Sequence, residues 1–213
     1  MNKMSKKSGN AAPADANGDK PAARSSARLV DRRVQKTRQL LSDALVSLVL
    51  EKGYDEVSIQ DIIDRANVGR STFYSHYENK EQLLLFGHEH LRALILHEED
   101  GPIDFLPFYR HLCQVHELAR KLLAAEASAE VLTRSLQDIL NGSLCRLYAA
   151  RRTAAEHTLF TLRADATAAA LVRLMTSWVK KGMPCSPEQM AEESTALLQR
   201  VLRLTEPAPA RDP

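Results

Sequence analysis

The chain has 213 residues and a net charge of +2, and 44% of its residues are apolar and 26% charged. This length suits one or two domains and is sufficient to bury a hydrophobic core. Ala, Leu, Glu and Arg recur throughout and no strand pattern stands out, so the composition favours a mostly helical globular protein over a sheet protein.

The charge is unevenly distributed, because residues 1–36 carry nine Lys or Arg against three Asp. A basic amino terminus suits contact with a polyanion, although a solvated tail has the same composition. The amino terminus lacks the apolar core of a secretory signal, and the apolar runs are too short to cross a bilayer. Three cysteines without CxxC spacing indicate free or structural thiols in a reducing compartment. We therefore expect a cytoplasmic protein without membrane contact.

Residues 1–28 are rich in small and polar residues and Lys, with almost nothing to bury. We predict that they form a disordered basic tail. Sustained helical periodicity begins near Val34, from which Leu and Ala recur along one stripe. Gly53 suits the position that ends this helix, because glycine adopts a positive φ without strain.

A compact helix of roughly two turns follows Ser58, which suits its N-cap, with Asp61 at the capping-box position. The break after this helix contains Asn67 and Gly69, two residue types that tolerate unusual φ values. A second short helix is predicted over about residues 70–77.

The rest of the chain predicts further helices of the same kind, about nine in all. Asn79 is the expected cap of a long helix that begins at Lys80. Near the carboxyl end, Gly182 and Pro184 end one helix and Ser186 caps the next. The later helices are expected over about 104–125, 129–151, 154–163, 165–181 and 187–204, and residues 206–213 are expected to be disordered.

The two short helices and the three-residue break between them form a helix-turn-helix arrangement. In that motif the second helix lies in the DNA major groove, with its amino-terminal residues at base edges. Phe73 and Tyr77 are spaced to bury toward the preceding helices, which leaves Arg70, Ser71 and Tyr74 on the opposite side.

These exposed residue types suit a nucleic acid. Arg70 could donate a bidentate pair to guanine or bind a phosphate. Ser71 and Thr72 offer hydroxyls to phosphates or base edges, and Tyr74 and His76 can donate to phosphate oxygens. A short polar helix on its own is more often only a solvated surface, so the neighbouring signals decide between the two interpretations.

Residues 37–84 read "TRQLLSDALVSLVLEKGYDEVSIQDIIDRANVGRSTFYSHYENKEQLL". This run resembles the TetR family of bacterial transcription regulators. The shared features are a helix that ends in Gly-Tyr, a hydroxyl cap, a small-Val-small turn, an aromatic-Tyr pair and a following lysine. Asn67 departs from the glycine usual in the family's turn. A weaker resemblance covers "WVKKGMPCSPEQMA" at 178–191, which looks like the bridge between the last two helices of many members.

The resemblance implies a helix-turn-helix DNA-binding domain over residues 29–80 and a helical effector-binding and dimerisation domain over residues 81–205. It implies that Tyr74 and Lys80 contact phosphates, and that Arg70 and Ser71 read bases, with Gln60 reaching an adjacent base. The residues expected at DNA are Ser58, Gln60, Gly69, Arg70, Ser71, Thr72, Tyr74, Ser75, His76 and Lys80.

The resemblance also implies a homodimer through the last two helices, which would bind a palindromic operator in double-stranded DNA. A small-molecule effector would occupy a pocket formed by the helices after about residue 100. Ordinary core positions attract the same aromatic residue types as a pocket does. The candidate pocket residues are Phe105, Phe108, Tyr109, Cys113, Tyr148, Phe160 and Trp178.

We therefore expect a sequence-specific DNA-binding regulator, most simply a repressor that an effector releases from its operator. The alternatives are a helical protein-binding adaptor and a DNA-binding regulator without a ligand. No motif assembles a nucleophile with its base, so we do not expect an enzyme. Five of the seven histidines lie between His88 and His116, but their helical spacing is poor for coordination, and we expect neither a metal nor a cofactor.

Overall fold

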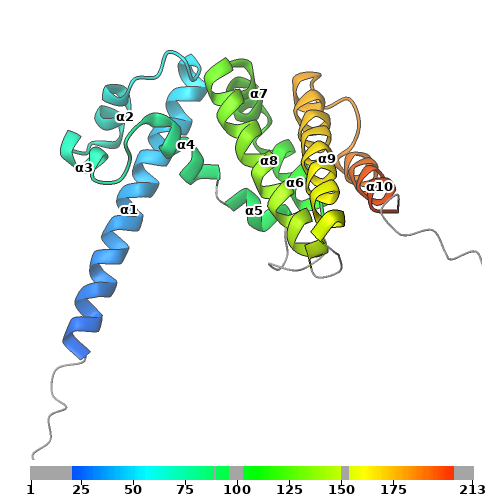
Figure 1. The fold of residues 1–213 in the computed structure, drawn as a ribbon. Coiled ribbons are helices and arrows are strands. Elements are labelled where there is room, and N and C mark those ends of the chain that lie inside the picture. Colours follow the sequence, from blue (N-terminus) through cyan, green and yellow to red (C-terminus); the bar gives the residue numbers. More distant parts are fainter. Residues whose placement is uncertain (1–20, 89, 96–102, 150–153, 204–213) are drawn as a thin grey trace, which may run out of the picture. The chain divides into compact units, whose positions relative to one another are not determined.

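The computed structural model describes residues 21–88, 90–95, 103–149 and 154–203, and their regular elements are all helices (Figure 1). This confirms the predicted all-α class, with ten helices in these ranges where about nine were expected. The chain divides into two compact units, Met1–Arg38 and Gln39–Pro213, and the first contains the amino-terminal part of α1. The helices are α1 (Pro21–Lys52), α2 (Ile59–Ala66), α3 (Arg70–Tyr74), α4 (Lys80–His88), α5 (His90–Ile95), α6 (Leu106–Gln114), α7 (His116–Ala124), α8 (Glu126–Ala149), α9 (Ala154–Lys180) and α10 (Pro187–Arg203).

The first helix begins earlier than the sequence predicted. α1 starts at Pro21, inside the segment 1–28 that was expected to be disordered. Proline favours the first helical position, and the Ala and Arg residues after Pro21 are good helix formers. The periodicity argument missed them because it detects an apolar stripe and not helix propensity. Residues 1–20 and 204–213 lie outside the described residues, so disorder there stays a prediction.

The start of α2 has the predicted capping box. The Ser58 hydroxyl accepts a hydrogen bond from the Asp61 amide at 3.1 Å, and the Asp61 carboxylate accepts one from the Ser58 amide at 2.8 Å. Lys52, in the last turn of α1, lies 2.9 Å from the same carboxylate. Hydrogen bonds from Ser58 and the nearby Lys52 ammonium hold the pKa of Asp61 well below its usual range.

A left-handed residue ends α2 and turns the chain toward α3. Asn67 adopts φ 52° and ψ 49°, and its amide donates to the Asp64 carbonyl while the Val68 amide donates to the Ile63 carbonyl. Asn67 therefore adopts the unusual conformation that it was predicted to tolerate, whereas Gly69 has an ordinary φ of −73°. The helix after the turn, α3, spans five residues and ends three residues before the predicted limit of about residue 77.

Two hydrophobic cores organise the helices from α1 onward. The amino-terminal core joins α1, α2, α3 and α4 and also includes Leu122, Ala125 and Leu132 at α7 and the start of α8. The carboxy-terminal core fills the space among α5 to α10 and includes Ala119 and Leu123 of α7. α7 therefore contributes side chains to both cores.

Two helix boundaries after residue 100 differ from the sequence prediction. The expected helix over 104–125 is divided at Val115 into α6 and α7, since Val115 adopts φ −108° and ψ 27°. Conversely, the two helices expected over 154–163 and 165–181 form the single helix α9.

The link from α9 to α10 is built as predicted. Gly182 has a φ of 78° just beyond the end of α9, and the Ser186 hydroxyl accepts a hydrogen bond from the Gln189 amide at 3.2 Å. The Trp178 indole donates to the Cys185 carbonyl at 3.1 Å, which holds this link against α9. Within the described ranges, no helix combines the length and the apolar character needed to cross a membrane.

We expect Asp61→Asn to destabilise the fold near neutral pH and to have little effect in acid. A lowered folded-state pKa means that the Asp61 carboxylate contributes stability above its unfolded pKa of about 4, and that this contribution is lost as the pH falls through the folded-state value. Thermal unfolding from pH 7 to pH 2 measures the difference between the variant and the wild type. Asp138→Asn, at an exposed position on α8, is the matched control. A difference that stays constant with pH contradicts the assigned role.

Candidate nucleic-acid interface and adjacent cavity

The helix α3 has one buried and one exposed side. Phe73 is fully buried and Tyr77, just beyond the helix, is 5% exposed, as predicted for the side that packs on the neighbouring helices. Tyr74 is 48% exposed, which is unusual for a large aromatic side chain. Arg70, Ser71 and Ser75 are also exposed, and Thr72 and His76 are half-buried.

Arg70 brings α2 and α3 together at the exposed surface. Its Nη1 atom lies 3.5 Å from the Gln60 Oε1 atom, and its guanidinium carbon lies 5.9 Å from the centre of the Tyr74 ring. The distance to Gln60 is long for a hydrogen bond, so the guanidinium can exchange this partner for a stronger one at little cost. The Gln60 amide donates to Asp64 at 2.8 Å. Arg70, Gln60 and Tyr74 therefore form one exposed polar cluster, here called the α2–α3 cluster.

Gly69 lies at the start of α3 without a conformational requirement for glycine. A Cβ atom added there would meet its nearest atom, the Thr72 hydroxyl oxygen, at 3.6 Å, which is ordinary van der Waals contact. Since φ is also ordinary, the fold would accept alanine at this exposed position. The missing side chain instead leaves the backbone at the amino end of α3 open to close approach by another molecule.

Two of the three serines predicted to contact DNA already have partners within the chain. The Ser58 hydroxyl donates to the Asp61 carboxylate at 2.6 Å, and the Ser75 hydroxyl donates to the Thr72 carbonyl at 2.7 Å. Both serines are exposed, so their oxygen lone pairs stay accessible. They can accept a hydrogen bond from a ligand, but each hydroxyl proton is in use.

Lys80 has partners within the chain, and its predicted phosphate contact stays a prediction. Its ammonium donates to the Tyr54 carbonyl at 3.1 Å and to the Val57 carbonyl at 3.0 Å, and it lies 4.4 Å from the centre of the Tyr54 ring. The Tyr54 hydroxyl in turn donates to Glu81 at 3.2 Å. Burial, reinforced by Glu81, raises the pKa of Tyr54 well above its usual range. The Lys80 side chain therefore ties α4 to the loop before α2.

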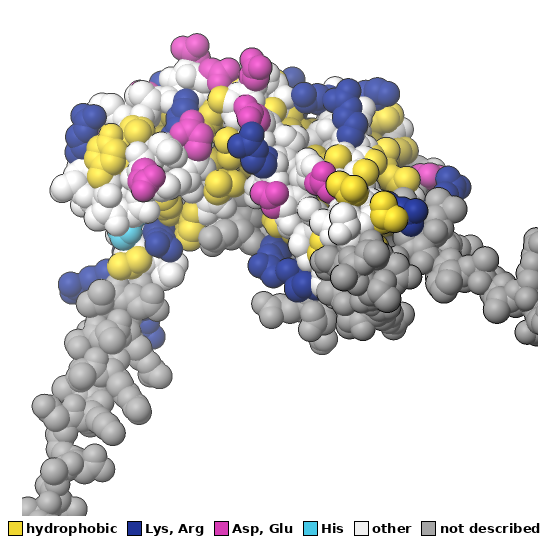
Figure 2. Space-filling model, in the orientation of Figure 1, with side chains coloured by type: hydrophobic (Ala, Val, Ile, Leu, Met, Phe, Trp, Pro, Cys, Tyr) yellow, Lys and Arg dark blue, Asp and Glu magenta, His cyan; other side chains and the backbone are white. Residues whose placement is uncertain are grey.

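Charge on the described surface is mixed. On the face seen in Figure 2, Lys and Arg side chains alternate with Asp and Glu, and acidic side chains gather along the upper edge. No single basic patch covers this face among the residues that are coloured. Contact of this face with a polyanion would therefore depend on individual Lys or Arg side chains and on polar donors.

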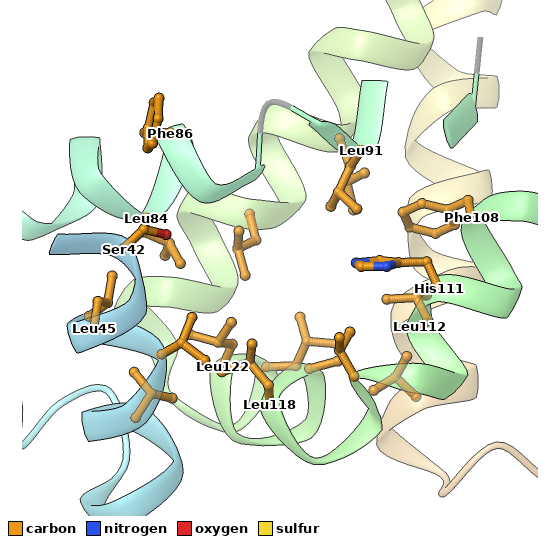
Figure 3. A pocket seen from close by; sticks show the side chains of 18 of the residues that line it. Ser42, Leu45, Leu84, Phe86, Leu91, Phe108, His111, Leu112, Leu118 and Leu122 are labelled. Carbon is orange, nitrogen blue, oxygen red and sulfur yellow. The ribbon is translucent and has the colours of Figure 1, made fainter. Parts of the chain in front are cut away.

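A cavity of about 650 Å³ lies beside the amino-terminal core, at a place that the sequence did not predict. Its walls come from α1 and from the helices α4 to α9, and Figure 3 shows Ser42, Leu45, Leu84, Leu118, Leu122 and His111 around it. Of the six predicted pocket residues whose side chains the structure describes, only Phe108 lines this cavity. The α1 and α7 walls have no distinct sequence signal, because their Leu and Val residues repeat like ordinary core positions.

The other predicted pocket residues serve the carboxy-terminal core. Phe105, Tyr109, Phe160 and Trp178 are buried in it, and Cys113 is half-buried against it. The Tyr109 hydroxyl shares a 2.7 Å hydrogen bond with Ser194, and burial raises the pKa of Tyr109 to about 12. The side chain of Tyr148 lies outside the described residues. In the part of the chain that the structure describes, no three His, Cys, Asp or Glu side chains are grouped to hold a metal.

Comparison with known proteins supports the resemblance to the TetR family that the sequence indicates. The sequence model of the family described as "Bacterial regulatory proteins, tetR family" matches residues 41–85. The chain is 43% identical over 65 residues to the uncharacterized HTH-type transcriptional regulator YxbF of Bacillus subtilis, covering 30% of this chain and 17% of YxbF. It is 34% identical over 76 residues to the "Probable acrEF/envCD operon repressor" of Escherichia coli K12, covering 34% of each chain. The aligned parts thus span well under half of these relatives.

The likeness to a solved structure extends further along the chain. The TetR transcriptional regulator from Streptococcus agalactiae 2603V superimposes with a TM-score of 0.50 and 26% identity, over 85% of this chain and 99% of that one. The fold and the helix-turn-helix segment are therefore similar to those of bacterial TetR-type regulators. The match to the TetR family itself is carried by residues 41–85.

We expect Lys80→Met to lower the free energy of unfolding by about 1–3 kcal/mol, because two carbonyl groups lose a charged donor. Urea-induced unfolding measures this loss. Lys180→Met, at an exposed position at the end of α9, is the control and should change stability little. If Lys80→Met keeps full stability and only weakens DNA binding, the phosphate role predicted from the sequence is right and the structural role is wrong.

Proposed function

We propose that the protein is a sequence-specific DNA-binding transcriptional regulator, and that it acts as a repressor. The observation that carries this proposal is the α2–α3 cluster, in which Arg70, Gln60 and Tyr74 are presented together on a helix-turn-helix. Arg70 and Ser71 stand at the amino end of α3, where such a helix reads base edges. Such a protein would work in the bacterial cytoplasm.

The proposal of repression follows the name of one of the relatives. The acrEF/envCD protein is named as an operon repressor, and its similarity to this chain covers 76 residues. The relatives are named as regulators and not as enzymes, which supports a role without a catalytic step. The cluster also speaks against a protein-binding adaptor, because an adaptor has no need of Arg70 and Tyr74 beside an open backbone at Gly69.

Operator recognition would use two copies of the chain. A helix of five residues covers only one half-site, so a C2 dimer that matches a palindrome would supply the second. α9 has an exposed apolar face suited to this contact, with Leu159 at 60% and Leu162 at 65% exposure and exposed alanines at 166, 169 and 170. Hydrophobic side chains gather on the part of the surface that α9 occupies in Figure 2. We therefore propose that α9, together with α10, forms the dimer contact.

A small molecule would control the regulator through the 650 Å³ cavity. The cavity has the volume of a site for a drug-sized ligand. A ligand that binds better to a conformation with wrongly spaced α3 helices must lower the affinity for the operator by linkage.

We expect the protein to bind the DNA upstream of its own gene, with an affinity that falls steeply as salt increases. Tyr74→Phe should weaken binding to all DNA sequences by a similar factor, since it removes a hydroxyl that can donate to a phosphate. Arg70→Ala should weaken the preferred site by about 10–100-fold and also reduce discrimination among sequences. Fluorescence anisotropy with the upstream fragment and scrambled DNA measures both effects. Unchanged sequence preference in Arg70→Ala refutes base reading by this residue, and absent or salt-insensitive binding refutes the proposal as a whole.

We expect Leu162→Glu to convert a dimer to a monomer, because a carboxylate would be buried without a partner in the contact. Sedimentation velocity measures the change. Leu40→Glu, at a 42% exposed position on α1, is the matched control and should stay dimeric. A monomeric wild type, or a dimeric Leu162→Glu variant, would show that α9 does not form the contact.

A further inference from the structure

The lining of the cavity is apolar over most of its extent and lacks a strong cation. Leu and Val side chains from α1, α4, α7 and α8 form most of the surface. Among the described residues that line it, none is Lys or Arg, and the one carboxylate is Asp43. The polar groups are Gln39, Ser42, Asp43, His111 and Thr176.

These polar groups are arranged mainly on α1. Gln39 and Asp43 are exposed and joined by a 2.8 Å hydrogen bond, and Ser42 is half-buried beside them. In Figure 3, Ser42 lies near Leu84 on one side, and His111 reaches into the cavity from α6 on another. The Thr176 hydroxyl donates to the Arg173 carbonyl at 3.2 Å, within α9. The exposed Asp43 and Gln39 therefore mark the side on which the polar end of a ligand would reach water.

The Lys121 side chain of α7 is engaged elsewhere. Lys121 donates to the Leu50 carbonyl near the end of α1 and lies 3.9 Å from Glu117 of its own helix. A carboxylate or phosphate group in the cavity would thus lose its hydration without gaining an ion pair with a Lys or Arg of the lining, and it would meet the negative charge of Asp43.

We propose that the cavity binds an apolar molecule whose polar end is neutral or positively charged, and that it excludes anionic amphiphiles. This inference deepens the effector role and rests on the proposed function. The ligand would lie directly against α1, because Leu45, Val46 and Val49 form part of the lining. Leu45 and Val49 also belong to the amino-terminal core, so the ligand contacts the helix against which the helix-turn-helix packs.

Three probes with one hydrocarbon chain and different polar ends test the ligand class: decan-1-ol, decylammonium and decanoate. Isothermal titration calorimetry of the full chain, with each probe below its aggregation concentration, measures the affinities. We expect decan-1-ol and decylammonium to bind at one site per chain, and decanoate to bind at least about tenfold more weakly. Decanoate that binds as well as the alcohol, or a failure of all three probes to bind, overturns the proposal.

Substitutions in the lining locate the site. Val46→Phe should fill part of the cavity and weaken the binding of decan-1-ol and decylammonium by about tenfold or more. If Val46→Phe does not fold, Leu118→Phe should have the same effect from α7. Val131→Phe, at a half-buried position on α8 outside the lining, is the matched control. Full affinity in both cavity variants shows that the probes bind elsewhere and contradicts the proposal.

Asp43→Asn tests the charge argument separately. It should reduce the difference in affinity between decanoate and decan-1-ol, and it should weaken the binding of decylammonium. Asp138→Asn should leave all three affinities unchanged. If the difference in affinity between decanoate and decan-1-ol is the same in Asp43→Asn as in the wild type, the role of this carboxylate is contradicted. Because calorimetry is done without DNA, a protein that binds the probes but no operator would refute the regulator proposal alone. A protein that binds the operator but no probe would refute only the ligand proposal.

Discussion

The burial of Phe73 is the constraint on which the DNA-facing surface depends. A helix of five residues is too short to be stable by itself, so α3 exists only because its neighbours hold it. Phe73 is fully buried in the amino-terminal core, and the left-handed Asn67 sets the direction in which α3 leaves α2. Once these two residues are fixed, the exposure of Arg70 and Tyr74 follows from helical geometry.

The contacts around that core show how a change at the cavity could alter the position of α3. Lys80 ties the start of α4 to the loop before α2, and α4 also lines the cavity through Leu83 and Leu84. α7 lines the same cavity and shares in both cores. The cavity is thus bounded by the elements that hold the helix-turn-helix in place, and no separate transmitting segment is required between them.

The sequence predicted those parts of the structure that depend on local signals. The capping box at Ser58 and Asp61, the left-handed Asn67 and the end of α9 at Gly182 each have a short, direct signature in the chain. The burial of Phe73 and Tyr77 followed from their four-residue spacing. The DNA contacts themselves stay predictions, since only the positions and partners of the side chains are seen.

Features that depend on packing between distant segments could not be predicted from the sequence. Lys80 has the right position for a phosphate contact, but whether its ammonium turns outward depends on two carbonyls more than twenty residues away. Five of the six aromatic residues proposed for the pocket lie in the carboxy-terminal core, because large rings bury well wherever helices cross, and one of them, Phe108, also lines the cavity. The cavity is lined by aliphatic residues whose pattern is identical to that of a filled core.

The participation of α7 in the amino-terminal core has a consequence for protein engineering. Leu122 and Ala125 cover apolar surface that α1 and α2 alone would leave in water. A hybrid regulator made by joining the first 88 residues to another protein's ligand-binding half would therefore lack part of its hydrophobic interior. To transfer the DNA specificity of this chain, the hybrid must also contain side chains equivalent to Leu122, Ala125 and Leu132. The part to be exchanged is therefore not one contiguous stretch of sequence.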